Sequence, residues 1–296
     1  MRTSRRDFLK SGVAVAALPV AAGALPQTAT GGSASDWVTL GKSDVRVTRL
    51  AFGTGTFSGK VQRDLGQAEF TRLVRYAYDR GIRFFETADS YHGMPQMLAI
   101  ALKGLPRDSY RLMTKYNTAD MSDPAGTISR LRSDLGADYV DIMLLHCVRT
   151  PTWPEDCKKL EDHFSEAKEK KVILSHGASV HGLSALDAFP GMNWLDVAMI
   201  RMNHKGTKMD TPAQHDSDDT GDVNHVTAQV HKVRSQGAGI ISMKLVGEGK
   251  FTNRADRQAA LKYAMNVAKV DAVTIGYKNT AEIDEAIENL NLALKA

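Results

Sequence analysis

The feature that most constrains the fold of this chain is a regular alternation of short apolar segments with longer segments of helical period. In the longer segments, apolar residues recur at i, i+3, i+4 and i+7, as they do at Phe70, Leu73, Val74 and Ala77. The short segments predict strands at Leu50 to Gly53, Arg83 to Thr87, Tyr110 to Lys115, Tyr139 to Leu145, Ile173 to Ala178, Leu195 to Met202, Gly239 to Lys244 and Ala272 to Gly276.

Strands that alternate with helices pair in parallel through right-handed crossovers. Eight such units, roughly 30 residues apart, predict an α/β fold of the (β/α)8 barrel (TIM barrel) type rather than an open doubly wound sheet. The open sheet also lacks its GxGxxG motif, of which Gly53-Thr54-Gly55 is only a fragment.

Local signals add detail to this barrel. Trp37 to Leu40 and Val45 to Thr48 predict an N-terminal β-hairpin ahead of the first barrel strand. Thr280 is placed to cap the last helix, and Gly81 and Gly237 are placed to end two others.

The amino terminus has a different character from the rest of the chain. A basic start, MRTSRRDFLK, precedes an uncharged run from Ser11 to Ala24 that ends in the small residues AGA. This pattern predicts a secretory signal cleaved near Ala24, and SRRDFLK resembles a twin-arginine (Tat) export signal. An ordinary basic amino terminus is the alternative.

We therefore divide the chain into a Tat signal peptide (1–24), a linker (25–36) and a barrel domain (37–296). This division predicts a periplasmic or otherwise exported protein that has the Tat machinery as a partner. No cysteine lies near the cleavage site, so we expect no lipid or other stable membrane anchor.

The net charge excludes polyanionic partners. Lys and Arg number 38 against 34 Asp and Glu, a net charge of +4, of which the first ten residues contribute a surplus of three. A mature chain near neutrality gives no electrostatic footprint for nucleic acid or an anionic membrane surface. Cys147 and Cys157 either pair in an oxidising compartment or remain thiols, since the geometry of a bridge is demanding.

A polar segment of about 20 residues, 203–222, interrupts the regular pattern after the sixth predicted barrel strand. It is either a lid over the face where barrels build active sites or a disordered surface insertion. Asp216, Asp218 and Gly221 resemble the start of a calcium loop, but Thr227 stands where that loop requires Glu. We expect no metal site, because His176, His181 and His204 also lack the spacing of metal ligands.

Four chemically compatible side chains stand at the carboxyl ends of three successive strands, or in the loop that follows: Glu86, Tyr91, Lys115 and His146. An ammonium beside a tyrosine hydroxyl favours the phenolate, and a carboxylate orients the ammonium. A histidine within reach can donate to a substrate oxygen. This set suits proton exchange at an oxygen while hydride moves at the adjoining carbon.

The segments GIRFFETADSYHG, RLMTKYN, ADYVDIMLLH and ILSHGAS resemble motifs of the aldo-keto reductase family, and the resemblance covers nearly all of the mature chain. It implies a (β/α)8 barrel that binds NADPH across its mouth and reduces carbonyls. Tyr91 then matches the proton donor, Lys115 the lysine that tunes it, and His146 the histidine that orients the carbonyl. Glu86 replaces the family's aspartate, so its carboxylate either bends to reach Lys115 or displaces it.

The resemblance also implies five cofactor contacts. Thr54 would meet the pyrophosphate, Ser179 the nicotinamide amide, Lys278 the 2′-phosphate of NADP(H) and Glu285 the adenine, and Lys244 is a candidate because it ends the seventh barrel strand. The alternatives are that Ser179 is a strand-end serine bonded to backbone and that Lys244 is a surface lysine.

Four positions depart from the family pattern: Val180, Met199, Met243 and Glu282, the last standing at a usual arginine. A methionine thioether at Met243 can still cover an aromatic ring. Arg201 and Asn203, at the end of the sixth barrel strand, are candidate substrate contacts.

The leading interpretation is an NADP(H)-dependent oxidoreductase acting on a small carbonyl, sugar or polyol, with the cofactor tightly bound because export removes its supply. The rival is an exported barrel that binds a sugar or polyol without redox turnover. A lyase or hydrolase ranks last, since no second carboxylate is well placed.

Overall fold

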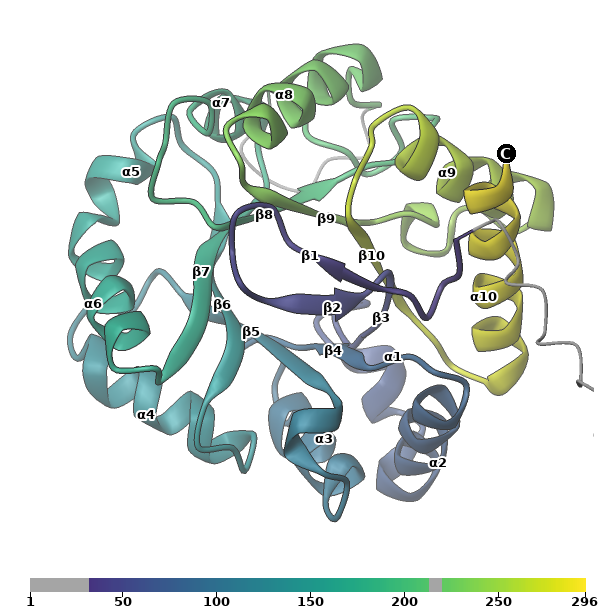
Figure 1. Cartoon of the computed structure of the whole chain (residues 1–296), viewed down its shortest axis with the longest axis horizontal. Helices are drawn as coiled ribbons and strands as arrows, with labels where there is room; N and C mark the ends of the chain where they lie inside the picture. The colour runs from purple at the N-terminus through teal and green to yellow at the C-terminus, as the bar shows by residue number, and fades with distance from the viewer. Residues whose placement is uncertain (1–31, 213–219) are drawn as a thin grey trace, which may run out of the picture. The chain divides into compact units, whose positions relative to one another are not determined.

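The computed structural model describes residues 32–212 and 220–296. Its centre is a closed barrel of eight parallel strands in the order β10-β3-β4-β5-β6-β7-β8-β9 (Figure 1). The strands are β3 (Leu50–Gly53), β4 (Phe84–Glu86), β5 (Arg111–Asn117), β6 (Val140–Val148), β7 (Ile173–Val180), β8 (Val197–Arg201), β9 (Gly239–Met243) and β10 (Ala272–Gly276). All eight predicted strands and the predicted barrel are confirmed.

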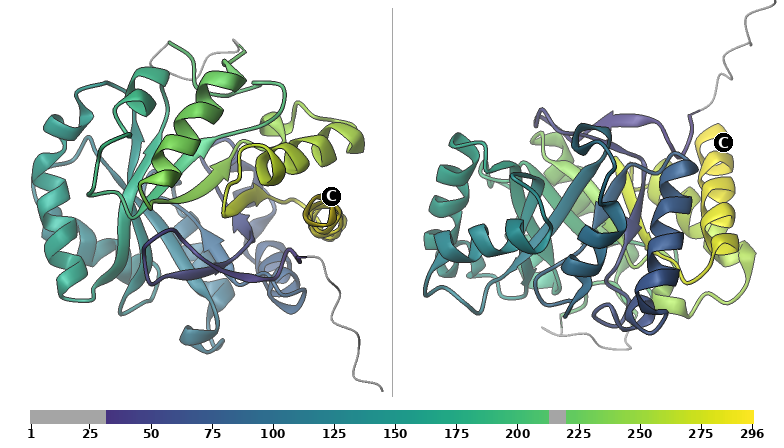
Figure 2. Two further views of the ribbon diagram at one scale, coloured as in Figure 1. Left: turned by 45° about the horizontal axis from the view of Figure 1, so that its top comes forward. Right: turned by 90° about the horizontal axis from the view of Figure 1, so that it is seen from below.

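Helices surround this barrel, as Figures 1 and 2 show. They are α1 (Lys60–Arg63), α2 (Gly66–Asp79), α3 (Met94–Leu102), α4 (Pro124–Asp134), α5 (Trp153–Asp156), α6 (Lys158–Glu169), α7 (Leu183–Asp187), α8 (Val223–Ser235), α9 (Arg254–Asn266) and α10 (Thr280–Lys295), with short 3₁₀ turns at Arg107–Ser109 and Gly247–Gly249. The predicted apolar stripe of α2 is buried against the strands.

The helix ends confirm two predictions and correct a third. Gly81 and Gly237 lie just beyond the ends of α2 and α8 with φ of 93° and 94°, a region that favours glycine. Thr280 does not cap α10. The cap is Asn279, whose side chain accepts a hydrogen bond from the backbone N–H of Glu282, so Thr280 is the first helical residue.

A hairpin of β1 (Trp37–Thr39) and β2 (Arg46–Thr48) crosses one end of the barrel, as predicted (Figures 1 and 2). Leu40, Val45 and Val47 pack with apolar residues of the barrel interior. A Cβ on Gly239, the first residue of β9, would lie 2.6 Å from that of Leu40. The hairpin therefore closes the amino ends of the strands, which leaves the carboxyl ends for the site.

The described part of the polar segment 203–222 is folded onto the barrel. Thr207 and Thr220 form an antiparallel bridge, and Asp210 is fully buried in an ion pair with Arg201 at 3.1 Å. The disordered-insertion interpretation is therefore wrong for the described residues of this segment. Two positions of the calcium-like motif, Asp216 and Asp218, lie outside the described residues.

The predicted signal peptide and most of the linker also lie outside the described residues. Within the part of the chain that the structure does describe, no helix is both long and apolar enough to cross a membrane. Cys147 and Cys157 are both thiols rather than a disulfide.

The β7–β8 pairing offers a test of the barrel register. Gly177 lies opposite Val197, and a Cβ at Gly177 would approach the Val197 carbonyl oxygen to 1.7 Å. We expect Gly177→Ala to lower the free energy of unfolding by about 3 kcal/mol or more, because the added methyl group forces the backbone of β7 and β8 apart. Urea unfolding measures this. Gly32→Ala, where a Cβ would make ordinary contacts at 3.4 Å or longer, is the control. Equal stability of the two variants would contradict the register.

Candidate functional site

The candidate active site lies at the carboxyl ends of β4, β5 and β6. Glu86 ends β4, Lys115 and His146 lie in the last residues of β5 and β6, and Tyr91 follows in the loop between β4 and α3. That loop turns at Tyr91, whose N–H donates to the Ala88 carbonyl at 3.1 Å. The structure thus brings together the four side chains that sequence analysis selected as catalytic.

Lys115 is the centre of this cluster. Its side chain is 1% exposed, and its Nζ donates to the Glu86 carboxylate, to the Thr87 carbonyl at 3.1 Å and to the Tyr91 hydroxyl at 3.2 Å. Burial lowers the pKa of Lys115, and the ion pair with Glu86 opposes that shift. The longer carboxylate of Glu86 therefore reaches the lysine without displacing it from the tyrosine.

His146 stands on the other side of Tyr91. The two rings meet edge to face with centroids 5.5 Å apart, and Ser90 Oγ lies 3.0 Å from His146 Nδ1. Burial, and next the charge of Lys115, hold the pKa of His146 well below its ordinary value, so the imidazole is neutral at neutral pH. Ser90, which sequence analysis did not select, fixes the ring through Nδ1.

These groups open into a cavity of about 510 Å³, which we call the catalytic cavity. Glu86, Tyr91 and His146 contribute to its wall, and Asn117, Arg149 and His181 add further polar side chains. Gly55 is another residue that sequence analysis missed. A Cβ there would lie 2.6 Å from the Tyr91 hydroxyl oxygen, so only glycine allows this approach. The sequence signal for this glycine is the motif Gly53-Thr54-Gly55, which begins at the last residue of β3.

Backbone strain is concentrated around the catalytic cavity. Eight described residues other than glycine have positive φ, and five of them line this cavity: Phe57, Ser58, Cys147, Lys244 and Glu248. Left-handed backbone is costly for such residues and recurs at functional sites. No residue pattern in the sequence predicts these conformations.

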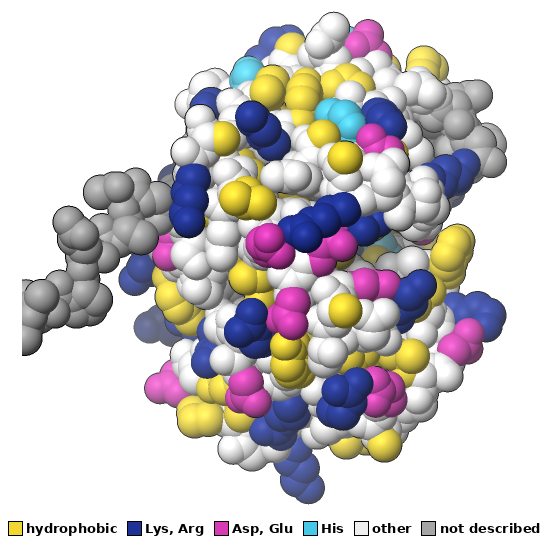
Figure 3. All heavy atoms as spheres, turned by 90° about the vertical axis from the view of Figure 1, so that its right-hand side faces the viewer, with side chains coloured by type: hydrophobic (Ala, Val, Ile, Leu, Met, Phe, Trp, Pro, Cys, Tyr) yellow, Lys and Arg dark blue, Asp and Glu magenta, His cyan; other side chains and the backbone are white. Residues whose placement is uncertain are grey.

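A second cavity of about 490 Å³ continues from the first, and we call it the distal cavity. Residues that line both are Thr56, Phe57, Val246, Glu248, Ile275 and Gly276. The distal cavity extends to the start of α10 and to α9, on the side shown in Figure 3. There, Lys and Arg side chains lie beside Asp and Glu side chains (Figure 3). Together the two cavities form one long groove.

The groove fits an elongated polar ligand such as a nicotinamide dinucleotide. Thr274 Oγ1 in the catalytic cavity and the Tyr277 hydroxyl in the distal cavity are buried polar atoms with no hydrogen-bond partner among the described residues. A Cβ on Gly276, between them, would meet Thr56 Oγ1 at 2.6 Å. The walls of the groove thus hold polar groups that no described residue pairs with.

Three of the five predicted cofactor residues line this groove. Lys244 lines the catalytic cavity, where it pairs with Glu248 at 2.5 Å, and Lys278 and Glu285 line the distal cavity. Thr54 and Ser179 are fully buried and line neither cavity. Ser179 Oγ instead accepts the Cys147 N–H at 3.0 Å, so its observed role is to hold the end of β6.

Of the positions that depart from the family pattern, Met199 and Met243 line the catalytic cavity, whereas Val180 is buried outside it. Two candidate substrate contacts are corrected. Arg201 pairs with buried Asp210, and Asn203 donates to the carbonyls of Thr207 and Lys244, so both hold the segment after β8 in place.

Of the three histidines that sequence analysis weighed as metal ligands, His176, His181 and His204, only His181 lines the catalytic cavity. His176 and His204 lie outside this cavity. The His176 ring stacks on Trp194 with ring centroids 4.5 Å apart, and the His204 ring packs against Phe251. Within residues 32–212 and 220–296, no group of three or more His, Cys, Asp or Glu is arranged to hold a metal ion.

Comparison with known proteins agrees with this geometry. The aldo/keto reductase family matches residues 49–260. The chain belongs to this family. An aldo-keto reductase structure from Bacillus halodurans, the holo form of AKR11C1, superposes with a TM-score of 0.65 at 17% identity, over 88% of this chain and 95% of that one. At this identity the likeness shows the fold alone.

Two curated relatives match in part. "Probable aldo-keto reductase 1" of Glycine max is 30% identical over 155 residues, which is 48% of this chain and 45% of that protein. The 9,11-endoperoxide prostaglandin H2 reductase of Trypanosoma cruzi is 30% identical over 144 residues, 47% of each protein. The chain thus spans about half the length of the curated relatives it matches.

The Glu86–Lys115 pair predicts a stability effect. Glu86→Gln leaves a buried ammonium without its counter-charge, so we expect the free energy of unfolding to fall by about 3–5 kcal/mol. Glu69→Gln, which breaks an exposed ion pair with Arg72, serves as the control and should have no measurable effect. Urea unfolding at neutral pH measures both. If the two variants are equally stable, Glu86 does not compensate Lys115.

Proposed function

We propose that this aldo-keto reductase interconverts a carbonyl and an alcohol with a nicotinamide dinucleotide as hydride carrier and Tyr91 as general acid and base. The observation that carries the proposal is the buried Lys115 ammonium, which donates one of its three hydrogen bonds to the Tyr91 hydroxyl at 3.2 Å. Burying a charged group costs desolvation free energy. Here the buried ammonium points at the Tyr91 hydroxyl, a group that can exchange a proton with a substrate.

Each residue has a distinct role in this reaction. Tyr91 delivers the proton to the carbonyl oxygen during reduction, and Lys115 stabilises the phenolate that remains. Glu86 holds Lys115 in its charged form and in position. The Ser90 hydroxyl lies 3.0 Å from His146 Nδ1. We propose the tautomer in which Ser90 donates to Nδ1, so that neutral His146 carries its proton on Nε2 and can donate to the same carbonyl oxygen.

A bound dinucleotide would supply the hydride. Met243 and Thr274 both line the catalytic cavity, so the Met243 thioether would cover the nicotinamide ring and Thr274 would contribute a polar side chain to the same wall. The family resemblance suggests NADP(H), held tightly. We propose a small carbonyl, sugar or polyol as substrate, since Asn117, Arg149 and His181 give the cavity polar side chains.

Binding of a sugar or polyol without redox turnover is the less favoured function. Hydrogen bonds from exposed polar residues would suffice for binding, and they would not require an ammonium buried against a tyrosine hydroxyl. That arrangement favours proton transfer.

We further propose that the protein is exported through the Tat pathway, on the evidence of the paired arginines in SRRDFLK. Because this route carries folded proteins, the cofactor would be acquired before export and kept. Replacing both Arg5 and Arg6 by Lys should retain the protein in the cytoplasm of a host with this pathway, whereas the unchanged chain should reach the periplasm. Immunoblots of cell fractions measure this, and cytoplasmic retention of both proteins would contradict export.

Tyr91→Phe tests the catalytic role. We expect turnover of carbonyl substrates to fall by about 10²–10⁴-fold or more, because the proton donor is lost, while the affinity for the dinucleotide changes little. Steady-state kinetics and nicotinamide fluorescence measure the two quantities. Tyr78→Phe is the matched control, since its hydroxyl bonds Ser109 outside both cavities. Wild-type turnover by Tyr91→Phe would remove this residue from the mechanism.

A further inference from the structure

We infer that the distal cavity selects NAD(H) over NADP(H), because the cations that a 2′-phosphate would need there are already paired with the cavity's own carboxylates. This inference rests on the proposed function, which places the nicotinamide end of the carrier beside Tyr91. It departs from the NADP(H) expected from sequence, and it names the chemical form of the cofactor from the charges of the groove.

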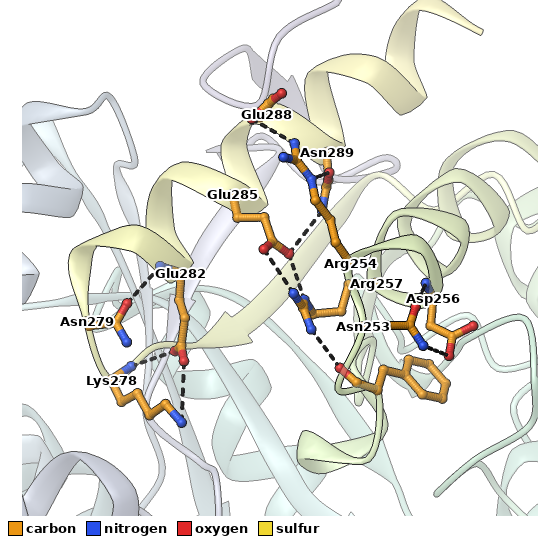
Figure 4. Close-up of polar contacts among 11 residues, drawn as sticks. Asn253, Arg254, Asp256, Arg257, Lys278, Asn279, Glu282, Glu285, Glu288 and Asn289 are labelled. Atoms are coloured by element: carbon orange, nitrogen blue, oxygen red, sulfur yellow. Dashed lines mark hydrogen bonds and ion pairs between the residues drawn. The ribbon is translucent and has the colours of Figure 1, made fainter.

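Continuity of the two cavities fixes where the adenosine end lies. The reacting ring must lie in the catalytic cavity, within reach of Tyr91, and the groove continues from there into the distal cavity. The far end of the distal cavity is lined by Lys278, Glu282 and Glu285, around the first turns of α10 (Figure 4). The adenosine ribose therefore meets these side chains.

Arg257, the strongest anion-binding group of the distal cavity, is already paired. Its guanidinium donates to both carboxylate oxygens of Glu285, at 2.6 and 2.9 Å, and to the Phe251 carbonyl at 2.9 Å (Figure 4). Hydrogen bonding within the pair lowers the pKa of Glu285. A bidentate pair of this kind leaves little capacity for a phosphate.

The start of α10 is occupied in the same way. Glu282 accepts the backbone N–H of Lys278 at 2.9 Å and lies 3.6 Å from the Lys278 ammonium. Asn279 accepts the Glu282 N–H at 2.9 Å (Figure 4). A helix N-terminus is a natural anion site, and here the chain's own carboxylate fills it.

The pairing of charges gives the same result. Arg257 and Lys278, the cations of the distal cavity, each lie beside a carboxylate, Glu285 and Glu282 respectively, and Glu248 pairs with Lys244 where the two cavities meet. A 2′-phosphate, which carries up to two negative charges, would have to displace a carboxylate to reach either cation and would otherwise be repelled by it. A ribose 2′-hydroxyl can instead donate to a carboxylate, which is how acidic residues select NAD in other dinucleotide sites. Glu282 is the group best placed for this.

The first experiment compares the two dinucleotides on the full wild-type protein. Titration with NADH and with NADPH, followed by nicotinamide fluorescence, should give a Kd for NADH at least about tenfold lower. Mass spectrometry of the denatured protein should find NAD(H) where a carrier is retained. An equal or lower Kd for NADPH overturns the inference and leaves the proposed function standing. If neither dinucleotide binds at millimolar concentration, the proposed function fails as well.

A charge-removing variant tests the role of Glu282. Glu282→Gln keeps an oxygen acceptor for the Lys278 N–H but removes the charge, so the Kd for NADPH should fall about tenfold relative to that for NADH. Glu288→Gln is the matched control, because Glu288 lies on the same helix, pairs with Arg254 and does not line the cavity. An unchanged NADPH-to-NADH ratio in Glu282→Gln, equal to that of the control, would overturn the assignment to Glu282.

Discussion

The buried charge of Lys115 is the interaction on which the rest of this site depends. An ammonium that is 1% exposed must be compensated within the barrel, and the compensation comes from the neighbouring strand. Glu86 of β4 lies opposite Met113 of β5, and Lys115 follows Met113 by two residues on the same face of the strand. Parallel register therefore turns both charges inward at the carboxyl end, and the third lysine donor is directed to Tyr91.

The rest of the fold leaves the carboxyl ends of the barrel strands open and holds the loops around them in place. The β1–β2 hairpin closes the amino ends, so the interior is apolar below the site. Arg201 and Asp210 form a buried pair that holds the segment after β8, and Asn203 bonds the Lys244 carbonyl. The backbone of that lysine is in the left-handed region, and its ammonium meets Glu248 between the two cavities. The charge pattern of the groove thus follows from loops fixed by buried polar contacts.

Sequence predicts the fold and the convergence of the four candidate catalytic side chains, because both follow from where the strands end. Strand ends are visible as the last residues of apolar runs, and in a barrel they converge, so Glu86, Lys115 and His146 could be selected without a structure. The cofactor contacts are less predictable. Ser179 stands at a strand end as expected, but a left-handed turn at Cys147 brings a backbone N–H to its hydroxyl. Lys278 has the expected charge, yet the Glu282 carboxylate, four residues later in the turn that starts α10, lies 3.6 Å from its ammonium. Such pairings depend on loop conformations that residue types alone do not specify.

The central claim is that a hydride passes between a nicotinamide and a substrate carbon beside Tyr91. Its most direct measurement is a single turnover of the purified wild-type protein, loaded with reduced dinucleotide carrying deuterium at C4 of the nicotinamide and mixed with a small aldehyde. We expect the nicotinamide absorbance to disappear in one exponential phase and deuterium from one face of the ring to be found on the carbinol carbon of the product. Persistent absorbance, or a product whose carbinol carbon carries no deuterium from either face, would contradict it.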